Sequence, residues 1–403
     1  MMAERSTLSV ADSSLVDNSP QSRARGLQSL IKQFADEAQQ RRRLSDPVID
    51  ALHDAGLFRM CLPAEFNGEE VDPWTTVETI EAISYSDGST GWNFMIGSET
   101  NGLAAGSMLK EQAEEIFGGD PVPRIVFCGA AGPPGTAEKV EGGWLVNGQW
   151  AYVSGCHQCD WFFGTAIVTE NGQPMMTDQN IPMVRMFLMP LEDVTIVDTW
   201  DVAGMRGSGS HDVVGKDVFV SDLRAESMLG MPTWHDSAIF HFPMQAKIAY
   251  NKVAVALGVA RAALDDFIDI ASEKKAFGTM TSIKDLPKTQ IEVAEAEASL
   301  GSARAYLKEQ LDRVWCLVQD GVTPANDDLA KLRLACSYGV QAAIEAVDRV
   351  TRLTTTTGNR MDCPLERYLR DVRAVAGHFT LGTALYEPIG KSILGTELTP
   401  GAL

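Results

Sequence analysis

The sequence predicts an α+β fold in which an N-terminal helical domain, a middle antiparallel β domain and a C-terminal four-helix bundle follow one another. Apolar residues recur at helical spacing in the first and last parts of the chain, whereas strand-like runs separated by turn signals fill the middle. A length of 403 residues fits two or three domains of ordinary size. We expect a disordered tail over residues 1–22, followed by domains at 23–121, 122–230 and 231–403.

The N-terminal domain is predicted from one apolar stripe and one bracketed helix. The stripe has helical spacing and consists of Leu27, Leu30, Ile31, Phe34 and Ala38. A second helix is expected at Asp46, which would cap it, with Pro47 in its first turn and Gly56 as its stop. Helical periodicity continues to about residue 118.

The middle block reads as sheet. Strand-like runs occupy residues 144–146, 149–154, 161–168 and 184–189. Asn147-Gly148 lies between two of these runs and predicts a two-residue hairpin turn, and Asn171-Gly172 is a second signal of the same kind. Both pairs favour the positive φ angles that such turns require, so we expect antiparallel pairing.

After Pro243 the chain returns to long helical periodicity, which predicts a helical bundle. One stripe runs up to the stop signal at Gly321 and consists of Leu300, Ala303, Leu307, Leu311 and Val314. A second stripe consists of Leu329, Leu332, Ala343, Ile344, Val347 and Val350. A loop of threonines ending in Gly358 precedes the last helix of the bundle.

Composition excludes several classes of function. The 34 basic and 54 acidic residues give a net charge of −20, which opposes binding to nucleic acid or to anionic membrane surfaces. Seven cysteines, an odd number, argue against a secreted disulfide framework. No window approaches eighteen consecutive apolar residues, and the N-terminus lacks a secretion signal, so we expect a cytoplasmic protein with no membrane partner.

Five local motifs occur in order along the chain: residues 62–68, residues 147–154, residues 204–210 with 217–220 behind them, Phe277-Gly278 with Gln290, and Arg370-Asp371. Together they resemble the acyl-CoA dehydrogenase superfamily over residues 25–395. The resemblance implies a flavin whose ring lies between the β domain and the C-terminal helices. It also implies that Tyr152 packs on this ring and that Ser154 hydrogen-bonds flavin N5, whose protonation changes with redox state. The alternative is a tyrosine and a serine that only pack in the sheet.

The last helix departs from the pattern of the main dehydrogenases. Those enzymes carry a glutamate base in the turn where this chain has His378-Phe379-Thr380-Leu381. His378 resembles instead the histidine of oxygenase components of two-component flavin-dependent monooxygenases, such as phenol hydroxylases and dibenzothiophene monooxygenase. An imidazole that titrates near neutrality would deprotonate a phenol or donate a hydrogen bond to a flavin C4a-hydroperoxide. We therefore expect His378 and Ser154 to be catalytic, although a histidine that caps a helix or faces solvent is the alternative.

The substrate side is expected near Trp92 and His157. Residues 86–93 resemble the corresponding helix of these hydroxylases, so Trp92 would line an aromatic substrate, or alternatively belong to the ordinary core. His157 lies in Cys156-His157-x-Cys159, which could be read as metal ligands. No second cluster stands at zinc-finger spacing, so we predict no metal site and place His157 at the wall of the active site.

The residues expected to bind the cofactor depart from the family pattern in two places. Lys274 stands where the family often has an arginine before Phe277, although Gln290 matches, and Phe127 and Cys128 begin the segment that replaces the loop holding the flavin pyrimidine. A lysine lacks the bidentate fork of arginine, which predicts weak binding of the cofactor. The resemblance thus implies reduced flavin, FMNH2 or FADH2, delivered by a separate NAD(P)H-dependent flavin reductase and used with O2. It also implies a homotetramer.

Two other functions stay open at this point. The chain could be an acyl-CoA dehydrogenase or a related flavin oxidase with a displaced catalytic base, which would hold FAD tightly. It could also be a non-enzymatic scaffold on the same fold, which would bind flavin in neither redox state. The oxygenase hypothesis differs from both, because it requires affinity for reduced flavin and an aromatic or heteroatom-bearing small molecule as the substrate that takes up oxygen.

Overall fold

The N-terminal part of the computed structural model is helical. The structure describes residues 17–225 and 233–397, so most of the predicted tail, residues 1–16, lies outside the described residues. Pro20 to Ser22 already belong to the first helix rather than to a tail. The helices are α1 (Pro20–Gly26), α2 (Gln28–Arg41), α3 (Asp46–Asp54), α4 (Pro73–Ser84), α5 (Gly88–Ser107) and α6 (Lys110–Phe117).

The bracketed helix forms as α3, with one change at its start. Pro47 lies in the first turn and Gly56 follows the helix with φ +69°, as the stop signal predicts. The N-cap, however, is Ser45, and Asp46 is already helical. Asp46 therefore does not cap the helix. Its carboxylate lies in the first turn, where it interacts favourably with the positive end of the helix dipole.

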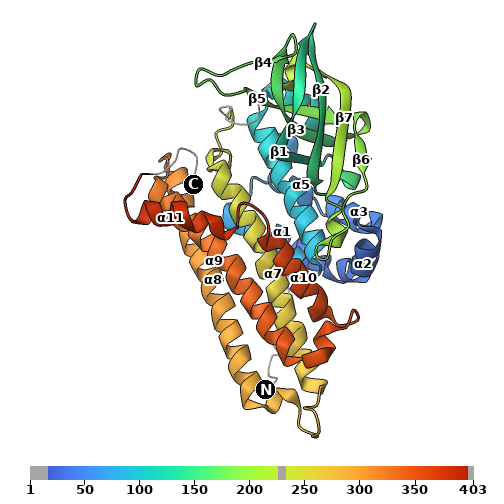
Figure 1. Cartoon of the computed structure of the whole chain (residues 1–403), viewed down its shortest axis with the longest axis vertical. Coiled ribbons are helices and arrows are strands. Elements are labelled where there is room, and N and C mark those ends of the chain that lie inside the picture. Colours follow the sequence, from blue (N-terminus) through green and yellow to red (C-terminus); the bar gives the residue numbers. More distant parts are fainter. Residues whose placement is uncertain (1–16, 226–232, 398–403) are drawn as a thin grey trace, which may run out of the picture.

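Within the described part of the chain, seven strands form one sheet, shown at the upper end of Figure 1. They are β1 (Phe127–Val140), β2 (Gly143–Val153), β3 (Trp161–Glu170), β4 (Gln173–Pro174), β5 (Val184–Pro190), β6 (Thr195–Val197) and β7 (His211–Ser221). Their order is β4-β3-β1-β2-β7-β6, and β5 also pairs with β3. All pairs are antiparallel except β1–β3. β3 pairs with the edge of β1 that β2 leaves free, and it runs in the same direction as β1.

The hairpin turn predicted at Asn147-Gly148 is wrong, because both residues lie inside β2. The Asn147 amide instead supports a bulge in β7: Asn147 Oδ1 accepts the backbone N–H of Asp217 at 2.8 Å, and Asp217 has φ +49°. Gly148 is needed for packing, since a Cβ there would lie 2.8 Å from Trp150 Cζ2. The turn predicted at Asn171-Gly172 is confirmed, with φ +51° and +72° between β3 and β4.

The packing at Gly148 leads to a stability prediction. Gly148→Ala is expected to lower the free energy of unfolding by about 1–3 kcal/mol, because the added methyl overlaps the buried Trp150 ring. Denaturant unfolding followed by tryptophan fluorescence measures the change. Gly132→Ala in β1 is the matched control, since no atom lies within 4 Å of a Cβ at that position, and it should be nearly neutral. Equal effects of the two substitutions would contradict the packing explanation.

The C-terminal bundle is confirmed. Its helices are α7 (Met244–Glu273), α8 (Pro287–Gln319), α9 (Asn326–Leu353) and α10 (Pro364–Ala376), followed by the short α11 (Tyr386–Ile393). α5 packs against both α7 and β1 and so joins the bundle to the sheet. Figure 1 shows the long helices extending away from the sheet toward the lower end of the molecule. Among the described residues, no helix is both long and apolar enough to cross a membrane.

One buried hydrogen bond fixes α10 against the segment before β7. The carboxylate of Asp371 accepts the backbone N–H of Met205 at 2.6 Å. Burial, together with the charge of Asp87, raises the pKa of Asp371 to about 7. Asp371 of the motif Arg370-Asp371 thus has a structural role here, because it holds α10 against the segment that contains Met205.

Candidate active site

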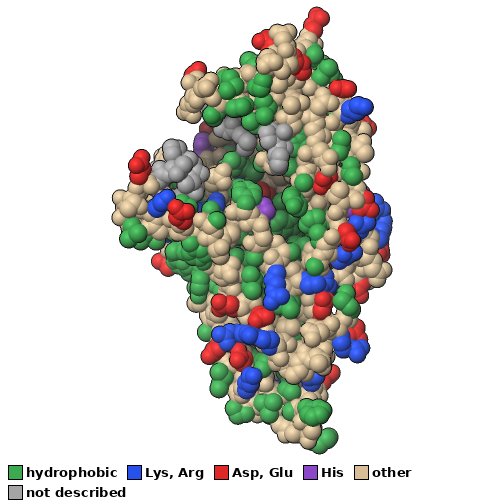
Figure 2. All heavy atoms as spheres, in the orientation of Figure 1, with side chains coloured by type: hydrophobic (Ala, Val, Ile, Leu, Met, Phe, Trp, Pro, Cys, Tyr) green, Lys and Arg blue, Asp and Glu red, His purple; other side chains and the backbone are tan. Residues whose placement is uncertain are grey.

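Three segments that are distant in the sequence meet where the sheet joins the helices. Trp92 of α5 donates from its indole Nε1 to Ser154 Oγ, which lies 2.9 Å away, just after β2. The ring of His378, which follows α10, packs edge-on to the Trp92 ring with 5.6 Å between centroids. Figure 2 shows that hydrophobic side chains are exposed at the middle of one face of the molecule, with a histidine among them. The structure therefore brings together three residues that sequence analysis singled out in separate motifs.

Ser154 begins a chain of buried hydroxyls. Its Oγ lies 2.7 Å from Ser210 Oγ, which in turn lies 2.7 Å from Ser208 Oγ. The backbone N–H of Gly155 donates to the Ser208 carbonyl at 3.0 Å and fixes this register. Because an indole N–H can only donate, Ser154 accepts from Trp92. Ser208 and Ser210 were not predicted as site residues; they lie in a glycine-rich segment that the sequence indicates only as a turn.

The imidazole of His378 has a defined tautomer. Its Nδ1 accepts the backbone N–H of Thr380 at 3.3 Å and lies 2.8 Å from the Thr380 hydroxyl. Since the backbone N–H can only donate, Nδ1 carries a lone pair and the proton of the neutral ring is on Nε2. Burial, with the charges of Lys252 and Arg333, lowers the pKa of His378 to about 3. The expected titration near neutrality therefore does not hold in this structure: the ring is neutral at pH 7, with its proton on Nε2.

Tyr152 is positioned as an exposed aromatic platform beside Ser154. Its side chain is 73% exposed, although it lies in a strand next to the fully buried Val153. Its φ of +63° is rare for a bulky residue and marks local strain. The edge of its ring meets Trp200 at 6.2 Å between centroids. Little of the ring is covered by the chain itself, which fits the predicted contact with a planar cofactor.

Asn93 is a site residue that sequence analysis did not single out. It is 1% exposed, yet neither its Oδ1 nor its Nδ2 has a hydrogen-bond partner within the described part of the chain. Its Oδ1 faces Gly155, because a Cβ built there would lie 3.5 Å from that oxygen. A buried amide without partners is costly unless a ligand completes its hydrogen bonds. Exposed aromatic surface beside such polar atoms fits a flavin, with its apolar ring and polar edge.

Phe127 and Cys128 are not open to a cofactor. Both side chains are fully buried, and Phe127 stacks on Phe117 with 5.5 Å between ring centroids. The Phe127 backbone N–H donates to Asn101 Oδ1, and its carbonyl accepts from the Thr100 hydroxyl at 2.7 Å. Phe127 packs in the cluster that contains Phe117, and Cys128 packs in the core of the sheet. The buried side chains therefore offer no open surface to a cofactor, and the role of this segment in cofactor binding stays a prediction.

The other predicted cofactor residues lie at the opposite end of the bundle. Lys274 Nζ donates to Thr357 Oγ1 at 2.7 Å, and Gln290 Nε2 donates to the Lys284 carbonyl at 3.2 Å. Phe277 is fully exposed in the connection between α7 and α8, at the lower end of Figure 1. These residues are not brought together with Ser154 within one chain, so they stay a prediction about a second subunit.

His157 lies beside His211 rather than beside Trp92, with 5.1 Å between the two ring centroids. Burial and the charge of His211 lower the pKa of His157, so it is mostly neutral at pH 7. Its predicted place at the wall of the substrate site stays a prediction. Over residues 17–225 and 233–397, no three His, Cys, Asp or Glu side chains are grouped so that they could hold a metal ion.

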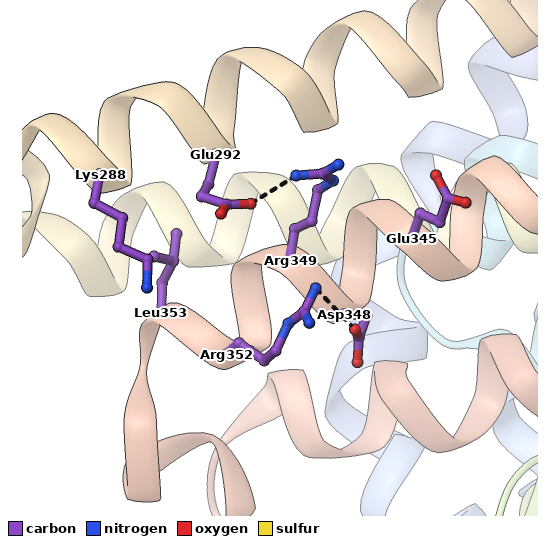
Figure 3. A pocket seen from close by; sticks show the side chains of 7 residues that line it. All are labelled: Lys288, Glu292, Glu345, Asp348, Arg349, Arg352 and Leu353. Carbon is purple, nitrogen blue, oxygen red and sulfur yellow. Dashed lines mark hydrogen bonds and ion pairs between the residues drawn. The ribbon is translucent and has the colours of Figure 1, made fainter.

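A pocket of about 440 Å³ lies elsewhere, between α8 and α9. Figure 3 shows its charged lining, with Glu292 of α8 facing Arg349 of α9. These two pair at 2.7 Å, and Arg352 pairs with Asp348 at 3.1 Å. The lining combines three basic residues, Lys288, Arg349 and Arg352, with three acidic ones, Glu292, Glu345 and Asp348, so its formal charge is balanced. It contains none of the predicted site residues.

Comparison with known proteins gives consistent matches. The family described as "Acyl-CoA dehydrogenase, N-terminal domain" matches residues 22–115, and "Acyl-CoA dehydrogenase, C-terminal domain" matches residues 250–382. An indole-3-acetate monooxygenase of Pseudomonas putida is 34% identical over 367 residues, which cover 91% of each chain. The crystal structure of 3-HSA hydroxylase from Rhodococcus sp. RHA1 is 26% identical with a TM-score of 0.86, covering 96% of this chain and 99% of that one. XiaF from Streptomyces sp., in complex with FADH2 and glycerol, is similar in fold: TM-score 0.85 at 23% identity, covering 95% and 97% of the two chains.

Proposed function

The chain belongs to the acyl-CoA dehydrogenase family, and from that premise we propose that it is the oxygenase component of a two-component flavin-dependent monooxygenase. It takes reduced flavin, FMNH2 or FADH2, from a separate NAD(P)H-dependent reductase and uses O2 to hydroxylate an aromatic small molecule. Indole-3-acetate, named for the Pseudomonas putida relative, is the first substrate to try.

The observation that carries this proposal is the contact between Ser154, Trp92 and His378. A hydroxyl, an indole and a neutral imidazole come from three parts of the fold and lie in one continuous row. A carboxylate base, which α-proton removal from a thioester requires, does not stand at position 378. The row instead offers hydrogen-bond donors and an aromatic wall, which suit the binding and oxygenation of a ring.

The residues at the end of β2 would hold the flavin. Tyr152 would cover one face of the ring, and Ser154 and Asn93 would bond its polar edge. When bound, a reduced flavin supplies the two electrons that oxygen insertion requires. Ser154 can serve either as donor or as acceptor to this edge, because a hydroxyl has both a proton and lone pairs.

His378 and Trp92 act on the substrate side. The Nε2–H of His378 donates a hydrogen bond to oxygen that develops charge, and Nδ1 stays occupied by Thr380. Trp92 is 9% exposed and provides a flat apolar wall for an aromatic ring. Burial of this row keeps water away from the reacting oxygen, which limits loss of oxygen as hydrogen peroxide.

A second copy of the chain fits the remaining cofactor residues. Phe277, Lys274 and Gln290 lie in or beside the connection between α7 and α8, at the end of the bundle away from the sheet (Figure 1), and would reach a flavin only in another subunit. The fully exposed ring of Phe277 is suited to such a contact. We include a homotetramer, in which these residues contact the cofactor of a neighbouring subunit, in the proposal.

The test is a single turnover with isotopic oxygen. The protein is mixed anaerobically with indole-3-acetate and reduced FMN or reduced FAD, then with 18O2, and the products are analysed by mass spectrometry. We expect one 18O atom in the aromatic product, with one of the two flavins clearly preferred. Protein that arrives with tightly bound FAD, is reduced by an acyl-CoA and incorporates no 18O would be a dehydrogenase instead.

A further inference from the structure

Four charged side chains are buried on α7 and on the two helices, α5 and α9, that pack against it. Glu99, Lys247, Lys252 and Arg333 are each only 3 or 4% exposed. Three of them are basic and one is acidic, so the cluster has an excess of positive charge. Burying an unpaired charge is costly, so the excess positive charge calls for an anionic partner.

The single carboxylate is fully engaged. Glu99 Oε1 accepts from Lys252 Nζ at 2.8 Å, and Oε2 accepts from Asn251 Nδ2 at 2.9 Å. Lys247 donates to the Ile239 carbonyl at 3.4 Å, and burial lowers its pKa. Glu99 therefore neutralises Lys252 and leaves Arg333 without an acidic partner in the part of the chain that the structure describes.

Arg333 has unused donors. Its Nη1 donates to the Gln245 carbonyl at 2.8 Å, but its buried Nε has no partner over the described residues. One turn further along α9, the fully buried hydroxyl of Ser337 is also without a partner there. A guanidinium keeps its charge at any physiological pH, so the imbalance cannot be removed by loss of a proton.

This cluster borders the candidate active site. Trp92, Met95 and Glu99 are spaced to share one face of α5, and Lys252 Nζ lies 3.8 Å from Met95 Sδ. The charges of both Lys252 and Arg333 act on His378, whose ring packs against Trp92. The positive charge is therefore next to the aromatic row rather than on a distant surface.

We propose that Lys252 and Arg333 form an anion subsite that binds the carboxylate of an acidic aromatic substrate while its ring lies against Trp92 and His378. The proposal rests on the monooxygenase function above and specifies its substrate class. Arg333 supplies the charge and the forked donors that suit a carboxylate, and the Lys252 ammonium, although paired with Glu99, contributes a further N–H donor. A bound carboxylate restores the balance of buried charge that Glu99 alone does not provide.

The experiment compares an acid with its neutral isostere. Indole-3-acetate and indole-3-acetamide are titrated calorimetrically into the full-length protein, anaerobically, with and without reduced flavin. We expect the acid to bind wild type roughly 10- to 100-fold more tightly than the amide, and Arg333→Met to remove this preference. Arg333→Lys should keep part of it, because one charge is retained. Arg349→Met on the same helix is the matched control and should keep all of it.

Other results would overturn the subsite. Equal affinity of wild type for acid and amide would do so, as would an unchanged preference in Arg333→Met. If Arg333→Met weakened reduced flavin and affected acid and amide alike, the cations would serve the flavin rather than the substrate. Failure of the proposed function is distinguishable, since wild type would then transfer 18O to neither indole compound. Oxygenation of both without preference would remove only the subsite.

Discussion

Replacing His378 with alanine is expected to slow formation of the oxygenated product by roughly 100- to 1000-fold, while flavin oxidation continues and releases hydrogen peroxide. The neutral ring presents a single N–H, on Nε2, next to Trp92, and alanine removes it. The measurement is the ratio of product to flavin consumed in single turnovers. Because His378 lies at the end of α10 and not within it, the fold should survive the change.

His378→Gln serves as the matched variant, since its amide keeps an N–H donor near the position of Nε2. We expect it to recover part of the lost product. With a pKa of about 3, His378 stays neutral from pH 5 to 8, so it should contribute no step to the pH dependence of the rate over that range. A step near pH 6.5 that vanishes in His378→Gln would show that the ring works as a base.

Replacing Asn93 with leucine is expected to change stability and function in opposite directions. Without ligand, the buried amide has no hydrogen-bond partner over the described residues, so its removal should raise the free energy of unfolding by about 1–2 kcal/mol. Binding of reduced flavin should weaken by about tenfold, because the amide would no longer bond the ring edge. Denaturant unfolding and an anaerobic flavin titration measure the two effects.

Asn101 is the control on the same helix. It is also fully buried, but its Nδ2 donates to the Ile125 carbonyl at 2.8 Å and its Oδ1 accepts the Phe127 N–H. Asn101→Leu should therefore destabilise the protein by roughly 2–4 kcal/mol, since partners are left unsatisfied. If Asn93→Leu were destabilising in the same way, the amide of Asn93 would have a structural partner and no site role.

Long periodic patterns predicted the fold well, because they record which faces are buried. The stripe from Leu300 to Val314 lies within α8, and the last turn signal at Gly321 follows its end. Short turn motifs were less reliable predictors at positions where tertiary packing determines which residue is present. Asn147-Gly148 is typical of a turn. In the structure Gly148 lies inside a strand, where a glycine is required because the Trp150 ring leaves no room for a side chain.

The site was partly predictable for a similar reason. Ser154, Trp92 and His378 stand in motifs with family counterparts, and the structure joins them. Asn93 carries no such signal, since an amide beside a tryptophan looks like any polar helix residue until its burial is known. The tautomer and low pKa of His378 also depend on Thr380, Lys252 and Arg333, and charges from distant helices cannot be read from local sequence.

The three linked serine hydroxyls have a consequence for how the site meets two redox states of one ring. Only the Trp92 end has a fixed direction, so the hydrogens of Ser154, Ser210 and Ser208 can all reverse by rotating about their C–O bonds. In one order Ser154 offers a lone pair, which suits a protonated nitrogen. In the other it offers its hydrogen, which suits a bare one. The two orders share the same heavy-atom positions, so with the flavin bound as proposed the serines can adapt to the gain or loss of electrons by rotating hydrogens alone.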